Sequence, residues 1–137
     1  EARLRQAPLK LVCAVPPLGA NAAWLAVSLD EEARERELRE RLDAGAAWIS
    51  SEFPGLEVLT ELVDGTPVDV LVDQSATACL TVVGTRGLGG FAGAIVGSTS
   101  RGVADHAKGP VLVVPFREDV RLGRRASFGP VQDQPES

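Results

Sequence analysis

The sequence predicts an α/β fold, an open parallel sheet with helices on both faces. Short apolar runs alternate along the chain with longer segments whose apolar residues recur every three or four positions. The hydrophobic share is 45% and only 4% of residues are aromatic, which predicts a core of Val, Leu, Ala and Ile. At 137 residues the chain has the length of one domain.

Four short segments are expected to be strands. Residues 9–15 (LKLVCAV) and 79–83 (CLTVV) are nearly continuous apolar runs, typical of strands that are buried on both faces of a parallel sheet. Residues 56–63 (LEVLTELV) alternate enough to form a strand at an edge of the sheet. Residues 111–114 (VLVV) form the last strand, which ends at Pro115.

Helical segments separate these strands. Residues 1–7 read as the last turns of a helix, and residues 30–51 have an apolar stripe opposite Glu–Arg pairs spaced four apart. A third helix starts at Thr66-Pro67 and runs to about Thr77, and a fourth covers residues 98–107. The residues expected to face inward are Leu38, Leu42, Ala46, Ile49, Val68, Leu71, Val72, Ser75 or Ala76, Val103, Ala104 and Ala107.

Charge and cysteine usage narrow the class of protein. The formal net charge of -5 argues against a dedicated nucleic-acid surface, and no apolar run reaches the roughly 18 residues of a membrane span. Cys13 and Cys79 lie in apolar runs, where cysteine acts as a small hydrophobic residue. Two such thiols make no secreted disulfide framework, so we expect a cytoplasmic protein.

A glycine-rich segment, residues 84–99 (GTRGLGGFAGAIVGST), joins the strand at 79–83 to the helix at 98–107. It therefore lies at the carboxyl end of a parallel strand, where open α/β sheets bind ligands. Glycine lets the backbone approach a ligand closely, and the following helix start adds unpaired N–H groups. This combination predicts an anion site, most naturally one for phosphate.

Two common phosphate-binding motifs fit the segment poorly. A Walker-type loop needs a Lys, and this segment has none. A dinucleotide-binding pattern occurs at Gly87, Gly89 and Ala92, but that pattern belongs after the first strand. It also needs an acidic residue about 20 positions on, where this chain has Ala107.

The spacing of three glycines resembles the nucleotide-binding signature of the universal stress protein family. Gly84 is followed after two residues by Gly87, and after nine more by Gly97 and Ser98. The resemblance covers residues 1–115, and residues 116–137 are expected to form a flexible tail. It implies five parallel strands in the order 3-2-1-4-5 and an adenine nucleotide, ATP with or without Mg, bound at their carboxyl ends. The implied nucleotide-binding residues are Gly84, Thr85, Arg86, Gly87, Gly97, Ser98 and Thr99.

The resemblance also implies two features beyond the loop. The family begins with a central strand that carries an Asp at the adenine, and this chain starts inside the helix that follows that strand. The first strand is therefore expected to be absent from this sequence. The last strand, Val111 to Val114, is expected to pair with its copy in a homodimer.

No residue is assigned a catalytic or metal-binding role. Ser98 and His106 would need an orienting acid to form a triad, and Asp69 and Asp73 suit a helix surface better than a metal site. Ser98 suits either a phosphate or the N-cap of its helix. The sequence predicts an ATP-binding stress-response or regulatory protein, and the alternatives are a dimerising scaffold that binds no nucleotide and a slow ATPase. A Gly97→Val change is expected to abolish binding and leave the fold intact.

Overall fold

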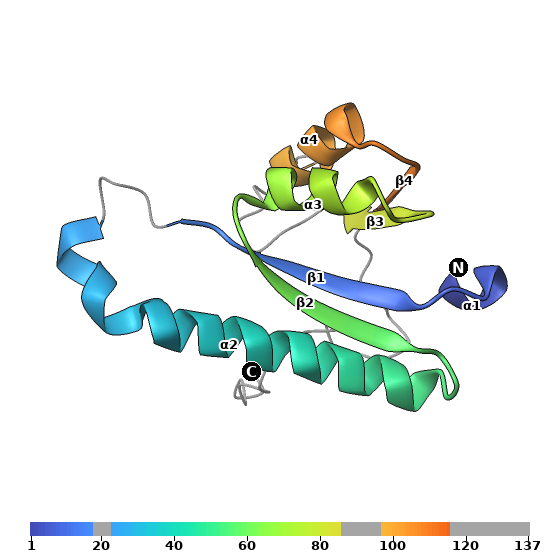
Figure 1. Ribbon diagram of the computed structural model, residues 1–137, viewed down its shortest axis with the longest axis horizontal. Helices are drawn as coiled ribbons and strands as arrows, with labels where there is room; N and C mark the ends of the chain where they lie inside the picture. Colours follow the sequence, from blue (N-terminus) through green and yellow to red (C-terminus); the bar gives the residue numbers. More distant parts are fainter. Residues whose placement is uncertain (18–22, 86–96, 116–137) are drawn as a thin grey trace, which may run out of the picture. The chain divides into compact units, whose positions relative to one another are not determined.

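The computed structural model describes residues 1–17, 23–85 and 97–115, with only the backbone for residues 23–30. Contacts divide the chain into two units, one with α1, α2 and most of β1 and β2, the other with α3, β3, α4 and β4. Figure 1 shows the elements, which are α1 (Ala2–Arg5), β1 (Leu9–Val15), α2 (Ala23–Glu52), β2 (Val58–Asp64), α3 (Pro67–Ser75), β3 (Thr81–Gly84), α4 (Ser98–His106) and β4 (Val111–Val114).

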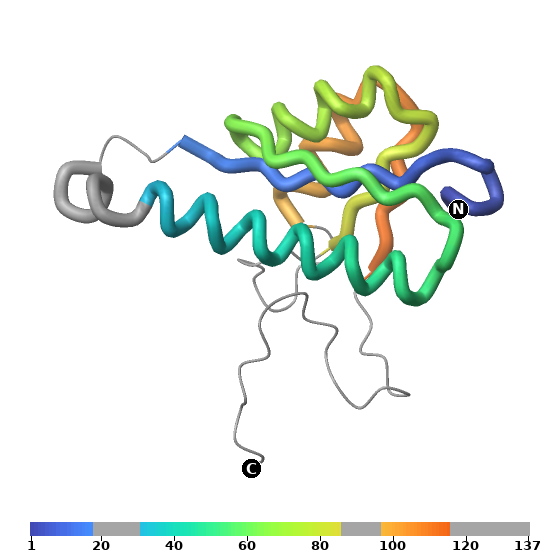
Figure 2. Tube along the Cα trace, turned by 60° about the horizontal axis from the view of Figure 1, so that its bottom comes forward, coloured from blue at the N-terminus to red at the C-terminus, as the bar shows by residue number. Residues whose placement is uncertain are grey.

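In the first unit, β1 and β2 form a two-stranded parallel sheet. Leu9 donates its N–H to the carbonyl of Glu57 at one end, and Gly65 donates to Val15 at the other, each at 2.9 Å. The starts of the two strands therefore lie side by side, and so do their ends, which makes the pair parallel. α2 runs alongside the pair in the opposite direction, as Figures 1 and 2 both show. This β1–α2–β2 order is the unit from which parallel sheets are built.

α2 is longer than its sequence pattern predicts. It begins at Ala23 instead of residue 30, because residues 23–30 (AWLAVSLD) contain neither Pro nor Gly to interrupt a helix. The inner stripe is confirmed in part, since the four residues expected there are half-buried around a buried Gly45; they are Leu38, Leu42, Ala46 and Ile49. Two arginines of α2 pair with a glutamate one turn earlier: the half-buried Arg41 with Glu37 at 2.7 Å and the exposed Arg39 with Glu35 at 4.0 Å.

In the second unit, β3 and β4 form another parallel pair, with Thr81 opposite Val111 and Gly84 opposite Val114. The helices α3 and α4 pack against each other and against this pair. Val70 of α3, Val83 of β3 and Val103 of α4 form the buried apolar core of the described residues, and Val103 is 0% exposed. The predicted α/β architecture with parallel strands is confirmed, and both observed pairings are neighbours in the expected strand order.

Within the second unit, the described helices cover only one face of the β3–β4 pair. Val82 is 52% exposed, and Leu112 and Val114 are 42% and 44% exposed. These three side chains share a face because Val82 lies opposite Leu112 in the ladder and side chains alternate along a strand. The sequence predicts burial of residues 79–83 on both faces, and within this unit the strand is buried on one. Only the side that carries Thr81 and Val83 packs against helices.

Several predicted core positions also need correction. Val70 and Ser100 are buried although neither was expected to face inward, and Ala104 is exposed. Of the two alternatives Ser75 and Ala76, Ser75 is the buried one. A pattern within one helix does not specify the contact between α3 and α4, where Gly102 lies against the side chain of Val68. Cys79 is exposed as well, because β3 begins at Thr81 and the cysteine precedes it.

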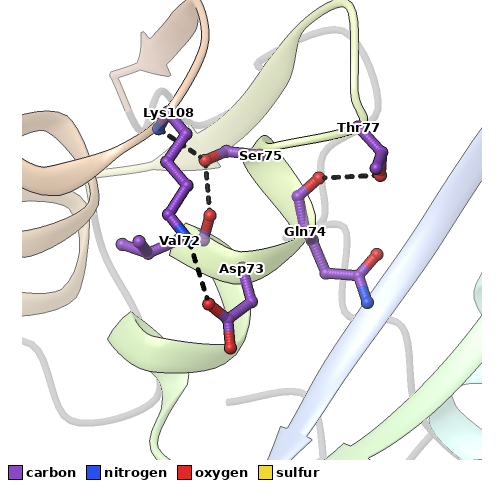
Figure 3. A network of polar contacts seen from close by, with 6 residues as sticks. All are labelled: Val72, Asp73, Gln74, Ser75, Thr77 and Lys108. Carbon is purple, nitrogen blue, oxygen red and sulfur yellow. Dashed lines mark hydrogen bonds and ion pairs between the residues drawn. The ribbon is translucent and has the colours of Figure 1, made fainter.

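A buried hydroxyl ties the end of α3 to the turn that follows α4 (Figure 3). Ser75 is 1% exposed, and its Oγ donates to the carbonyl of Val72 at 2.6 Å. The same oxygen accepts the backbone N–H of Lys108 at 2.8 Å. At the surface, Lys108 Nζ lies 3.5 Å from a carboxylate oxygen of Asp73. Two bonds therefore join these segments, one through the buried hydroxyl and one through an exposed ion pair.

We expect Ser75→Ala to lower the free energy of unfolding by about 1–2 kcal/mol, because it leaves the Lys108 N–H without its acceptor. Lys108→Gln removes only the exposed ion pair, and we expect it to cost less than about 0.5 kcal/mol. Urea unfolding of the two variants and the parent protein measures both effects. Equal losses in the two variants would contradict the importance given to the hydroxyl.

Candidate functional site

The two flanks of the glycine-rich segment lie next to each other. β3 ends at Gly84, and the next residue, Thr85, donates its N–H to the carbonyl of Val114 at 3.0 Å. The carbonyl of Thr85 then accepts the N–H of Gly97, also at 3.0 Å. This hydrogen bond closes the neck of the loop, so the carboxyl end of β3 and the start of α4 are held together.

Position 97 requires glycine because there is no room for a side chain, and its backbone angles are not the reason. Its φ of -71° and ψ of 161° are open to any residue. A Cβ at this position would lie 2.9 Å from the carbonyl oxygen of Thr85, which is the acceptor at the neck. The expectation that Gly97→Val leaves the fold intact is therefore wrong for the neck, because a side chain at residue 97 forces it apart.

The N-cap of α4 lies one residue earlier than expected. Gly97 is the N-cap and Ser98 is the first helical residue, so the prediction of Ser98 as N-cap is wrong. The first intrahelical bond runs from Arg101 N–H to Gly97 O at 3.0 Å. The N–H groups of Ser98, Thr99 and Ser100 therefore have no acceptor within the helix and are available to a ligand. Ser98 is exposed and its hydroxyl has no hydrogen-bond partner among the described residues, whereas the Ser100 hydroxyl donates to Gly97 O.

Five of the predicted binding residues lie at the carboxyl end of β3 or at the amino end of α4. They are Gly84, Thr85, Gly97, Ser98 and Thr99. Arg86 and Gly87 lie outside the described residues. Sequence reasoning identified these positions by glycine spacing. The sequence did not reveal that the carbonyl of Thr85 closes the neck, because a bond between two backbone groups leaves no pattern in the side chains.

The residues considered for catalysis or metal binding either lie far from the start of α4 or already interact with other side chains. His106 is the last residue of α4, about 12 Å along the helix axis from Ser98. Asp69 accepts the hydroxyl of its N-cap Thr66 at 2.6 Å, and Asp73 faces Lys108. Within the described residues, no group of three or more His, Cys, Asp or Glu side chains could hold a metal ion.

The two cysteines have different surroundings. Both are free thiols, and Cys13 is half-buried on β1 whereas Cys79 is exposed. Burial raises the pKa of the Cys13 thiol, and the positive charge of Arg41 offsets part of that rise. Cys13 therefore stays protonated at neutral pH and is a poor nucleophile.

No helix in the described ranges 1–17, 23–85 and 97–115 combines the length and apolarity needed to cross a membrane. The family model for the universal stress protein family matches residues 1–115. The chain belongs to this family. The match includes the glycine-rich segment and the elements that flank it, and it ends at Pro115, directly after β4.

Two curated relatives of this universal stress protein domain are mycobacterial proteins. Universal stress protein Rv2623 of Mycobacterium tuberculosis is 35% identical over 130 residues, which cover 88% of this chain and 42% of that protein. A universal stress protein of Mycolicibacterium smegmatis is 33% identical over 118 residues, covering 83% of this chain and 40% of that protein. The chain therefore spans about two fifths of the length of the curated relatives it matches.

Among solved structures, that of the hypothetical protein MJ0577 has a TM-score of 0.62 to this universal stress protein domain, at 20% sequence identity. The match covers 82% of this chain and 78% of that one. At this identity the likeness establishes the shared α/β fold.

Proposed function

We propose that this domain binds an adenine nucleotide, ATP, and acts as a stress-response or regulatory protein by binding it. The observation that carries the proposal is the closed neck between Thr85 and Gly97, which holds a glycine-rich segment at the carboxyl end of β3. This is where open α/β sheets bind ligands. Membership of the universal stress protein family supports the same interpretation, because the glycine spacing resembles that family's nucleotide signature.

The proposed contacts to the phosphates come mainly from the backbone. The free N–H groups of Ser98 and Thr99 lie at the positive end of the α4 dipole, and Ser98 adds a hydroxyl. Gly84 and Gly87 would let the chain approach the ribose and phosphates, and Arg86 would add a positive charge. Mg would reach the site together with the nucleotide, because the described residues provide no acidic cluster of their own for it.

The adenine contact is proposed to come from a strand outside these 137 residues. Thr81 and Thr85 direct their N–H groups to β4, so the backbone groups of Val82 and Gly84 lie on the opposite edge of β3. No described strand pairs with that edge. A further parallel strand there would satisfy these groups and carry the Asp that the family resemblance places at the adenine.

Calorimetric titration of the intact protein with ATP, AMP and inorganic phosphate tests the proposal. We expect ATP to bind with the highest affinity, because it brings three phosphates to the site together with the adenine, whereas AMP brings one phosphate and inorganic phosphate has no adenine. Adding ATP should also raise the unfolding temperature, since a ligand that binds only the folded state stabilises it. The absence of heat and of a thermal shift with all three would refute nucleotide binding, and phosphate release would identify a slow ATPase.

A second candidate function is a dimerising scaffold that binds no nucleotide. It is favoured by the exposed apolar side chains of Leu112 and Val114 on β4, a strand that pairs only with β3 among the described strands. Pairing of β4 with a second copy would cover such an edge. The titration with ATP separates the candidates, because the scaffold binds no nucleotide, and sedimentation equilibrium tests the dimer itself.

Two further features belong to the proposal. We place the domain at residues 1–115 and assign residues 116–137 as a tail, which limited proteolysis would remove without loss of ATP binding. We also place the protein in the cytoplasm, which agrees with its two free cysteines.

A further inference from the structure

Arg101 lies in the part of α4 where a positive charge is least favourable. It is the fourth residue of the helix, and its N–H makes the first intrahelical bond to Gly97. Helix dipoles favour anions at this end and cations at the other, so an arginine here weakens the helix unless an anion is nearby. The buried face of α4 carries Ser100 and Val103, whereas Arg101 and Ser98 are both exposed.

No described carboxylate balances this charge. Arg39 and Arg41 on α2 each pair with a glutamate four residues away, and Arg5 pairs with Glu1 in the same way. Asp105 has the same spacing from Arg101, yet no ion pair within 4.0 Å joins them, nor does any other described acidic residue pair with Arg101. Among the described residues, the guanidinium therefore has no acidic partner.

The geometry of a helix directs the arginine toward the neck of the loop. Long side chains on a helix lean back over the turn that precedes their own Cα. For Arg101 that turn contains Gly97 and Ser98. A guanidinium in this place adds up to five N–H donors beside the free N–H groups of Ser98 and Thr99, in a planar fork that suits phosphate oxygens.

We propose that Arg101 binds the phosphate chain of the nucleotide and makes the site select for the number of phosphates. This inference rests on the proposed nucleotide binding and adds a specificity-determining residue to it. A nucleoside without phosphate gains nothing from Arg101, whereas a triphosphate reaches from the backbone N–H groups of α4 to the guanidinium.

Arg101→Gln in the intact protein tests the proposal, with ATP and adenosine as probes. We expect the affinity for ATP to fall about tenfold, the loss of one charge-assisted contact, and the affinity for adenosine to change less than about twofold. The salt dependence of ATP binding should become shallower. The ligand-free variant should unfold at the same or a higher temperature, because a cation has left the positive end of a helix.

Arg36→Gln is the matched control, since it removes an equal charge from an exposed position on α2. It should leave the affinity for ATP unchanged. Equal ATP affinity in Arg101→Gln and the parent protein would overturn the role of Arg101 while leaving nucleotide binding intact. If the parent protein binds neither ATP nor adenosine, the proposed function itself fails, and the role of Arg101 fails with it.

Discussion

Gly97→Ala is expected to weaken ATP binding by at least about tenfold, although the substitution adds a single carbon. The new Cβ would lie 2.9 Å from the carbonyl oxygen of Thr85, and backbone atoms cannot move aside as a flexible side chain can. The bond between Gly97 N–H and Thr85 O must therefore lengthen or break. Titration calorimetry with ATP measures the loss.

The control for this prediction is Gly109→Ala. A Cβ at Gly109 would lie equally close to a backbone carbonyl, that of Ser75, at 2.9 Å. Gly109 follows α4, whereas Gly97 precedes it, and the helix is about 13 Å long. Gly109→Ala should therefore lower the unfolding temperature without a comparable loss of ATP affinity. Similar losses of affinity in both variants would show that the effect of Gly97→Ala reports general stability.

Val103→Ala is expected to have the largest effect on stability, a loss of about 2–3 kcal/mol in the free energy of unfolding. Val103 is 0% exposed at the centre of the α3–α4 core, so truncation removes two buried carbons and leaves a cavity. The better helix propensity of Ala offsets only about 0.5 kcal/mol of this loss. Denaturation with urea, monitored by circular dichroism, measures it.

Val82→Ala makes the same chemical change on the exposed face of β3. Because Val82 is 52% exposed, we expect its truncation to cost less than about 1 kcal/mol. The contrast between two identical truncations therefore measures how one-sided the β3–β4 pair is. A cost at Val82 as large as that at Val103 would mean that this face is covered in the folded protein.

The sequence predicts the strands well because each one ends at a visible signal. β1 and β4 match their predicted bounds, and Pro16 and Pro115 follow their last residues. α3 begins as expected at a Thr66-Pro67 start. Burial is predicted less well. An apolar run such as residues 79–83 indicates a strand, but it does not tell which elements pack against each face of that strand. The exposed side of Val82 is set by tertiary packing alone.

The candidate site is predicted from the spacing of its glycines, because the segment contains no side-chain motif of another phosphate-binding class. The spacing located Gly84 and Gly97 at the two flanks that the structure brings together through Thr85. The reason for Gly97 was not predictable, since the constraint is a backbone carbonyl twelve residues earlier in the chain. The position on which the proposal for Arg101 rests is visible in the sequence, as an arginine in the first turn of a helix that follows a glycine-rich loop.

The closed neck has a consequence for how such domains diversify. The entropy of joining the ends of a loop grows only slowly with its length, by about 0.6 kcal/mol for each doubling. In this domain a backbone bond between Thr85 and Gly97 fixes both ends, whatever residues lie between them. Evolution can then exchange or lengthen the interior of the loop at small cost to the scaffold. For the proposed nucleotide site, this means that ligand preference can change from one family member to another while the fold keeps its stability.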